Sequence, residues 1–132
     1  MRKDDSIHCF TVLGTPRPKS RPRFVKGRVV SSVDKNEKIW RRLVESEVAR
    51  LSHDAPIDYP VAIDMEFWFA TKDPDRVGRP HAQRPDKDNL EKLVLDVLTK
   101  KGVIKDDALV VTGRTAKMWA MMSGVDVAIY PA

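Results

Sequence analysis

The sequence contains one cysteine, Cys9, so no disulfide bond can form within the chain. Its three histidines, His8, His53 and His81, lie far apart and show none of the Cys/His spacings of zinc sites. No apolar run reaches the roughly 18 residues of a membrane span, and the N-terminus lacks the apolar core of a signal peptide. These absences predict a cytoplasmic protein without a membrane anchor.

A chain of 132 residues predicts one compact domain over 1–132. Its charges are distributed unevenly along the sequence. Residues 1–50 hold 13 Lys/Arg and 6 Asp/Glu, a net charge of +7, whereas residues 51–132 hold 11 and 13, a net charge of −2. An enzyme acting on nucleic acid needs cations for phosphate and carboxylates for a metal ion. A solvated basic loop with acidic helix ends would explain the same charges equally well.

Hydrophobic periodicity predicts two amphipathic helices and several strands. Apolar residues recur at helical spacing over 35–51, after a candidate N-cap at Asp34 with Glu37 three residues on, and again over 88–100, before Gly102. The predicted strands lie at 6–14, 59–70, 108–120 and 124–130, with a short hairpin at 24–30 around Lys26-Gly27 and a long polar loop at 71–85.

This order predicts an α/β (α+β) single domain, with a mixed β-sheet of about four to five strands and two helices packed mainly on one face. The strand at 59–70 alternates apolar and polar residues, so its apolar side should face the helices. Asp64 and Glu66 should point the other way, where a solvated strand face explains them better than a role as metal ligands.

Cations concentrate in TPRPKSRPRFVKGR, residues 15–28, which hold six Lys/Arg and no acid. Pro16, Pro18 and Pro22 predict an extended loop, because proline fixes φ and lacks the N–H donor. The candidate DNA-contacting residues are Arg17, Lys19, Arg21, Arg23, Lys26 and Arg28. They would contact phosphates and give salt-dependent affinity with little sequence information. A solvated charge run is the alternative.

Acidic residues gather at the start of the second helix, in RPDKDNLEKLVLDVL at 84–98, and again in KDD at 105–107. Asp86 and Asp88 are two residues apart in an extended approach, so their side chains can converge at a helix N-terminus, which favours anions. Lys92 follows Asp88 by one helical turn. Two or three aspartates could hold Mg²⁺ and leave positions for a phosphate oxygen and an attacking water.

Helix capping is the structural alternative for part of this pattern. Asp88 as N-cap with Glu91 at the third helical position would form a capping box, and Lys92 would pair with Asp88. An EF-hand loop is excluded, because Glu91 and Val97 stand where Gly and Glu are needed. Capping leaves three acids unexplained: Asp86, Asp106 and Asp107.

Together these stretches resemble the RusA-like endodeoxyribonucleases, the Holliday-junction resolvases of phages and prophages. The family pattern falls here on Pro85, Asp86, Asp88, Asn89, Leu90, Lys92, Asp96, Asp106 and Asp107. The N-terminal GTPRPKSRPRF and the closing SGVDVAIY also match the family. The resemblance therefore spans nearly the whole chain and is far more specific than Asp-x-Asp alone.

The resemblance implies an endodeoxyribonuclease of recombination and repair that depends on Mg²⁺ or Mn²⁺ and makes paired nicks in a four-way DNA junction as a homodimer. It places the catalytic residues at Asp86, Asp88, Lys92 and Asp107, and the metal ligands at the three aspartates of that set. Asp107 is preferred over Asp106 because it is the second of the pair, and a helper role for Asp106 stays open. No small-molecule organic cofactor is implied. Two alternatives remain, a protein that binds junctions or branched DNA without cleavage, and a nuclease for flaps or other branched DNA.

Overall fold

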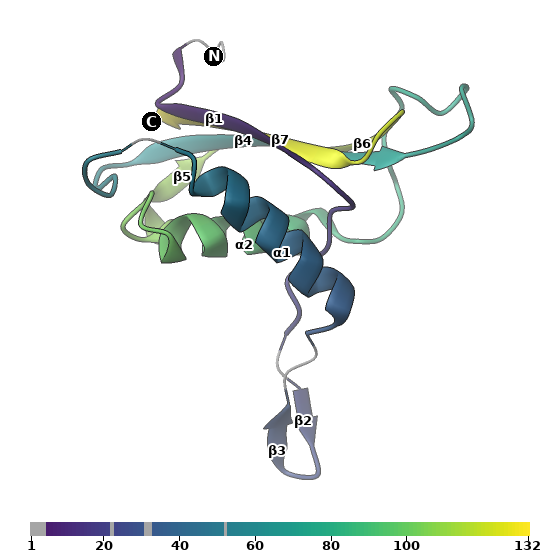
Figure 1. Ribbon diagram of the computed structural model, residues 1–132, viewed down its shortest axis with the longest axis horizontal. Helices are drawn as coiled ribbons and strands as arrows, with labels where there is room; N and C mark the ends of the chain where they lie inside the picture. Colours follow the sequence, from purple (N-terminus) through teal and green to yellow (C-terminus); the bar gives the residue numbers. More distant parts are fainter. Residues whose placement is uncertain (1–4, 22, 31–32, 52) are drawn as a thin grey trace.

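The computed structural model of the protein describes residues 5–21, 23–30, 33–51 and 53–132. In this part of the chain a five-stranded mixed sheet carries two α-helices on one face, and a two-stranded hairpin stands away from that body (Figure 1). The elements are β1 (His8–Leu13), β2 (Arg23–Val25), β3 (Arg28–Val30), α1 (Lys35–Val48), β4 (Val61–Ala70), α2 (Lys87–Lys100), the 3₁₀ helix η2 (Asp107–Leu109), β5 (Val110–Thr112), β6 (Thr115–Ala120) and β7 (Gly124–Pro131). The predicted fold class is confirmed.

Strand β4 lies at the centre of the sheet, between β7 and the short strands β5 and β6. It pairs antiparallel with β7, which pairs antiparallel with β1. On its other side β5 and then β6 run parallel to it. The prediction of one strand over 108–120 is therefore wrong. The strand breaks at Gly113, where a side chain would collide with the backbone oxygen of Ile63, and the N–H of Arg114 donates to the Asp64 carboxylate at 2.9 Å.

The hydrophobic core lies between the sheet and the two helices. Strand β4 buries the alternate residues Val61, Ile63, Met65, Phe67 and Phe69, as its pattern predicts. The helices bury Trp40, Val44 and Val48 from α1, and Leu90, Leu93, Val94, Val97 and Leu98 from α2. Each such side chain contributes about 1.5–3 kcal/mol of hydrophobic stabilisation. This packing fixes the position of α2 on the sheet, and with it the position of its first turn.

The first helix begins as its sequence predicts but ends earlier. The Asp34 carboxylate accepts the N–H of Glu37 at 2.7 Å, so Asp34 is the N-cap. The Glu37 carboxylate does not complete a capping box. It accepts the N–H of Ser20 at 3.1 Å and the hydroxyl of Ser20 at 3.3 Å. The cap residue that ends α1 is Ala49, two residues short of the predicted end. Glu37 therefore ties the basic loop to α1.

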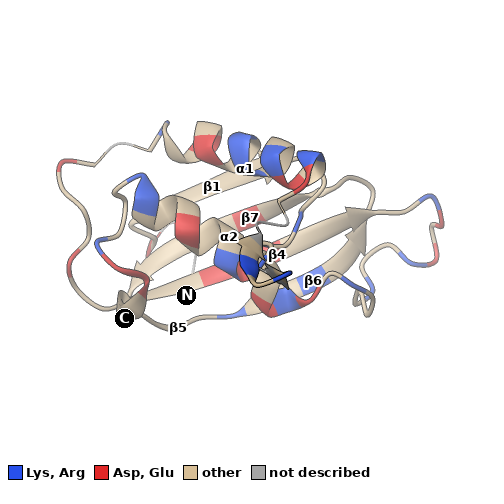
Figure 2. Ribbon diagram, turned by 90° about the horizontal axis from the view of Figure 1, so that it is seen from below, with Lys and Arg blue, Asp and Glu red and all other residues tan. Residues whose placement is uncertain are grey.

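Residues of both charges occur along the two helices, with Lys and Arg close to Asp and Glu in α1 and in α2 (Figure 2). The predicted loop at 71–85 is present, and one isolated bridge joins its Pro80 to Met118 of β6.

None of the helices in the described part of the chain combines the length and apolar character that a membrane crossing requires.

Candidate active site

Two aspartates stand at the start of α2. Asp86 is the N-cap, in an extended conformation, and its carboxylate makes no capping hydrogen bond. Asp88 lies in the first turn, and both side chains are exposed. The alternative in which Asp88 caps the helix is not supported, because α2 begins at Lys87 and Asp88 is already its second residue. Both carboxylates are therefore available at the positive end of the helix dipole, where anions are stabilised.

Lys92 and Asp96 follow Asp88 along α2 but have different surroundings. Lys92 is exposed, and within the described residues it forms no ion pair with Asp88. The alternative explanation of Lys92 as a helical ion-pair partner is thus not supported. Asp96 is partly buried and pairs with Arg41 at 2.8 Å, Lys19 at 3.3 Å and Lys100 at 3.3 Å. Asp96 therefore has a structural role, joining the basic loop and α1 to α2.

Replacing Asp96 by Asn is expected to lower the free energy of unfolding at pH 7 by about 1–2 kcal/mol, less than for a fully buried pair because Lys19 and Lys100 are well exposed. Burial raises the pKa of Asp96, but hydrogen bonds from Arg41 and Lys100 and the charge of Lys19 outweigh it and hold the pKa below its ordinary value of 3.8. Because the pKa of Asp96 is lower in the folded protein than in the unfolded chain, the ionised carboxylate stabilises the fold above the ordinary pKa. This stabilisation is lost as the pH falls through the pKa of the folded state.

Urea unfolding of the wild type and Asp96→Asn between pH 7 and pH 3 measures this effect. The difference between the two proteins should shrink below about pH 4. The control is Asp58→Asn, at an exposed aspartate outside the helices. An Asp96→Asn difference that stays constant down to pH 3 would contradict the role of the charge.

The acidic pair after α2 divides into a capping residue and an exposed one. The Asp106 carboxylate accepts the N–H of Ala108 at 2.8 Å and caps η2. Asp107, the first residue of η2, is exposed, and η2 lies against α2. Within the described ranges, no three His, Cys, Asp or Glu side chains are gathered closely enough to hold a metal ion. Asp86 and Asp88 thus share one helix end, and Asp107 lies on the adjoining element.

The first part of the basic loop lies against the start of α2. The N–H of Lys19 donates to the Asn89 carbonyl at 3.0 Å, and the Arg21 guanidinium donates to the Asn89 side-chain oxygen at 3.1 Å. A hollow of about 350 Å³ opens beside these contacts, and it is lined by Arg17, Pro18, Arg84, Pro85, Asp86 and Asn89. Two arginines therefore border the same hollow as the unused N-cap carboxylate.

The second part of the basic loop is the predicted hairpin, β2–β3. Its turn is Lys26-Gly27, with φ angles of 51° and 77°, and Val25 pairs with Arg28 across it. Positive φ at both turn residues is typical of a two-residue hairpin turn. Lys26 and Arg28 are exposed on this projecting hairpin (Figure 1). The side chain of Arg23, another candidate, lies outside the described part of the structure, as does Pro22.

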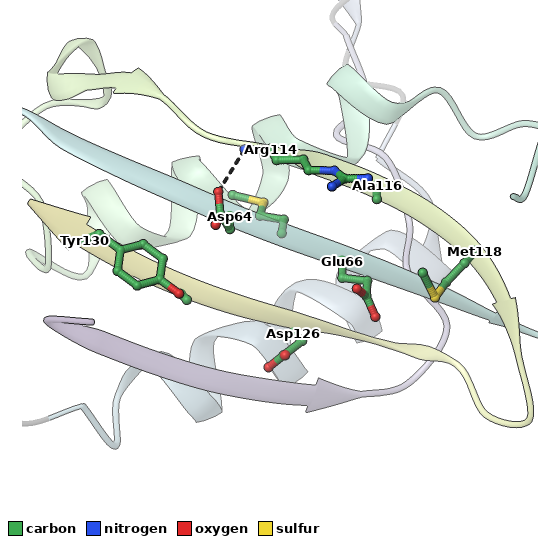
Figure 3. A pocket seen from close by; sticks show the side chains of 9 residues that line it. Asp64, Glu66, Arg114, Ala116, Met118, Asp126 and Tyr130 are labelled. Atoms are coloured by element: carbon green, nitrogen blue, oxygen red, sulfur yellow. Dashed lines mark hydrogen bonds between the residues drawn. The ribbon is translucent and has the colours of Figure 1, made fainter. Parts of the chain in front are cut away.

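The acids of β4 lie on the sheet face away from the helices. Asp64 and Glu66 line a hollow of about 320 Å³ with Asp126 of β7 and Arg114 (Figure 3). Asp64 accepts the Arg114 N–H, and Glu66 accepts the indole N–H of Trp68 at 2.7 Å. Because α2 packs on the opposite face, these acids are separate from the start of α2. The prediction that they point away from the core is confirmed.

Three contacts near the site were not predicted from the sequence. Asn89 belongs to the recognised motif, but its role in holding Lys19 and Arg21 depends on the folding of a distant loop. Glu37 carried a capping signal, yet it binds Ser20. Lys117 of β6 donates to two carbonyls just before Asp86. A lysine in a strand gives no sequence signal for such a contact.

The chain is similar to known DNA endonucleases. A family model described as Endodeoxyribonuclease RusA matches residues 14–130. Similar proteins include the crossover junction endodeoxyribonuclease RusA of Escherichia coli (strain K12), 39% identical over 71 residues, and its namesakes in Shigella sonnei (strain Ss046) and Enterobacteria phage 82, both 38% identical over 71 residues. Each alignment covers 54% of this chain and 54% of the relative, so the chain spans about half the length of the curated relatives it matches. The family match includes the basic loop, α2 and η2.

Proposed function

Because the chain belongs to the RusA family of endodeoxyribonucleases, we propose that it is a divalent-metal-dependent endonuclease that resolves four-way DNA junctions by paired hydrolysis. Residues 1–132 act as one nuclease domain, and two copies form a homodimer. The observation that carries the proposal is the hollow at the start of α2, where Arg17 and Arg84 lie beside Asp86. Cations for the DNA backbone and a carboxylate for a metal thus meet at one place.

The donor set at this place fits Mg²⁺ or Mn²⁺. Both ions prefer oxygen ligands, and Mg²⁺ keeps several of its waters, so a few carboxylates suffice to hold it. The Asp86 side chain makes no capping hydrogen bond although Asp86 is the N-cap of α2, and Asp88 is not paired with Lys92, whereas the Asp106 carboxylate is occupied in capping η2. We therefore assign the ligands to Asp86, Asp88 and Asp107, which would draw together around the ion, because within the described ranges they are not gathered closely enough to hold it. The proximity of η2 to α2 supports the assignment of the third.

Hydrolysis forms a bond from a water oxygen to the phosphorus and breaks one backbone P–O bond, which leaves a phosphate end and a hydroxyl end. A bound divalent ion supplies Lewis-acid stabilisation and a more acidic water. Lys92 is exposed one turn beyond Asp88, where its ammonium would stabilise negative charge on the reacting phosphate or orient the water. Arg17 and Arg84 would hold the neighbouring phosphates.

The basic loop brings DNA to this site. We assign phosphate contacts to Arg17, Lys19, Arg21, Arg23, Lys26 and Arg28. The hydrogen bonds of Lys19 and Arg21 to Asn89 support this, because they fix the loop beside the proposed ligands. The projecting hairpin extends the basic surface beyond the body. In a homodimer, two such sites would match the two-fold symmetry of a four-way junction.

The proposal is tested by incubating the purified protein with a labelled synthetic four-way junction in Mg²⁺, with EDTA as the control. We expect paired nicks in opposite strands that require the metal. Linear duplex and a flap substrate run in parallel. Binding without nicking would identify a junction-binding protein instead, and much faster cleavage of the flap would identify a flap nuclease.

The double substitution Lys26→Ala with Arg28→Ala should weaken junction binding and reduce the slope of log K against log salt concentration by about two. Each phosphate contact releases roughly one condensed counterion, so two lost contacts change the slope by that amount. Fluorescence anisotropy at several salt concentrations, without divalent metal, measures it. The matched control is Arg50→Ala with Lys72→Ala, which removes two exposed cations elsewhere. An unchanged slope in the hairpin variant would place the hairpin outside the DNA interface.

A further inference from the structure

The segment before Asp86 runs along the outer edge of β6. The N–H of Gly78 donates to the Trp119 carbonyl at 2.9 Å, and the Trp119 N–H donates to the Arg79 carbonyl at 2.9 Å. The N–H of His81 then donates to the Lys117 carbonyl at 3.1 Å. The end of the long loop is therefore attached to the sheet as far as His81.

The His81 ring anchors this point. It is 5% exposed, with its centroid 4.0 Å from that of Phe69 in a stacked arrangement and 4.3 Å from that of Trp119. Burial lowers the pKa of His81, and the nearby charge of Lys117 lowers it further, so the ring is neutral at pH 7. The chain thus enters residues 82–85 from a fixed, apolar position.

Beyond His81 the segment is held to β6 by the side chain of Lys117 and, among the described residues, no longer by backbone hydrogen bonds. Its ammonium donates to the Gln83 carbonyl at 2.6 Å and to the Pro85 carbonyl at 2.8 Å. Hydrogen bonds from a charged donor are stronger than those between neutral groups. The Pro85 carbonyl belongs to the peptide unit that joins Pro85 to Asp86. Lys117 therefore holds the peptide group that directly precedes the first proposed metal ligand.

Residues 84–86 also line the hollow with Arg17 and Asn89. Residues 83–85 are thus bound through their carbonyls to Lys117 of β6, and they share the hollow with the basic loop. We propose that Lys117 is a positioning residue for the active site, whose two hydrogen bonds hold residues 83–85 so that the Asp86 carboxylate is set for divalent-metal binding. This inference rests on the proposed function, because it gives Asp86 the role of a ligand.

The variant Lys117→Met keeps the length of the side chain and removes its donors. Lys117→Arg retains a cationic donor, and Lys101→Met is the matched control, because Lys101 is at the C-terminal end of α2 and pairs with Glu45 at 3.6 Å. Two readouts do not depend on nuclease activity. The first is hydrogen exchange at residues 82–88 without metal. The second is the affinity for Mn²⁺ in the absence of DNA, measured by calorimetry.

Lys117→Met should exchange faster at residues 82–88 and bind Mn²⁺ about 10–100-fold more weakly, the usual effect of removing a group that orients a metal ligand. Lys117→Arg should recover most of the affinity, and Lys101→Met should match the wild type. At saturating metal, single-turnover nicking by Lys117→Met should approach the wild-type rate, with unchanged junction affinity.

Wild-type exchange and wild-type Mn²⁺ affinity in Lys117→Met would overturn the proposal. So would faster exchange at every residue, which would indicate general destabilisation; if Lys117→Met does not fold, Lys117→Gln takes its place. The nuclease proposal fails separately, if the wild type binds Mn²⁺ but does not nick junctions. If the wild type binds no Mn²⁺, Asp86 is not a ligand and the positioning proposal fails as well.

Discussion

Replacing Asp88 by Asn is expected to lower the rate of junction nicking by at least about 10³-fold, because the Lewis-acid contribution of a metal is several kcal/mol and each 1.4 kcal/mol is a factor of ten. Binding of the junction should persist, since the substitution removes a negative charge near phosphates. Asp88 is exposed in the first turn of α2, so the substitution should leave the fold intact.

Single-turnover nicking at saturating protein separates the two effects, with binding measured in Ca²⁺ or EDTA. Asp75→Asn, at an exposed aspartate of the long loop, is the control and should behave as the wild type. Nicking by Asp88→Asn within tenfold of the wild type would remove Asp88 from the catalytic group.

The neighbouring aspartates Asp106 and Asp107 should respond differently to the same substitution. Asp107→Asn should abolish nicking to a similar extent as Asp88→Asn, because it would remove a proposed metal ligand. Asp106→Asn should retain most of the activity, because Asn caps a helix about as well as Asp and can keep the hydrogen bond to Ala108. The structural basis is that the Asp106 carboxylate is occupied at the start of η2.

The pair is measured in one assay, with junction binding and thermal unfolding as controls for each variant. The reverse result, with Asp106→Asn inactive and Asp107→Asn active, would assign the third ligand to Asp106. Equal loss in both variants would mean that both carboxylates act. Full activity in both would exclude η2 from the site.

Local patterns predicted the elements whose form depends on neighbouring residues. Strand β4 alternates apolar and polar residues, and the structure buries the apolar side. In α2 the residues at helical spacing are all buried in the core, namely Leu90, Leu93, Val94, Val97 and Leu98. Lys26-Gly27 takes the two positive φ angles of a tight hairpin. In these cases the hydrophobic pattern or the turn residues alone determine the outcome.

Tertiary contacts decided the features that the sequence did not predict. Asp88 and Asp96 lie on similar sides of α2, yet only Asp96 is enclosed by cations, because Lys19 and Arg41 come from other elements. The strand break at Gly113 depends on the approach of the Ile63 backbone. The N-cap of α2 is Asp86 and not Asp88, although aspartate is a good capping residue at either position. Such outcomes depend on which distant groups fold beside a residue.

The candidate site could likewise be predicted only in part, because some of its contacts depend on tertiary structure. The motif located Asp86, Asp88 and Lys92 along the chain, and the structure places them at the exposed start of α2. The contact of the basic loop with Asn89 and of Lys117 with the Pro85 carbonyl could not be predicted, because each joins segments far apart in the sequence. These contacts bring the basic residues to the carboxylates.

The central claim is that a divalent metal binds at the start of α2. The most direct test is a crystal structure with Mn²⁺, in which anomalous scattering locates the ion. The account predicts a peak within coordination distance of carboxylate oxygens of Asp86 and Asp88, with Asp107 completing the site. A well-occupied peak only on the far face of the sheet, at Asp64, Glu66 and Asp126, or no peak near Asp88 at saturating Mn²⁺, would contradict it.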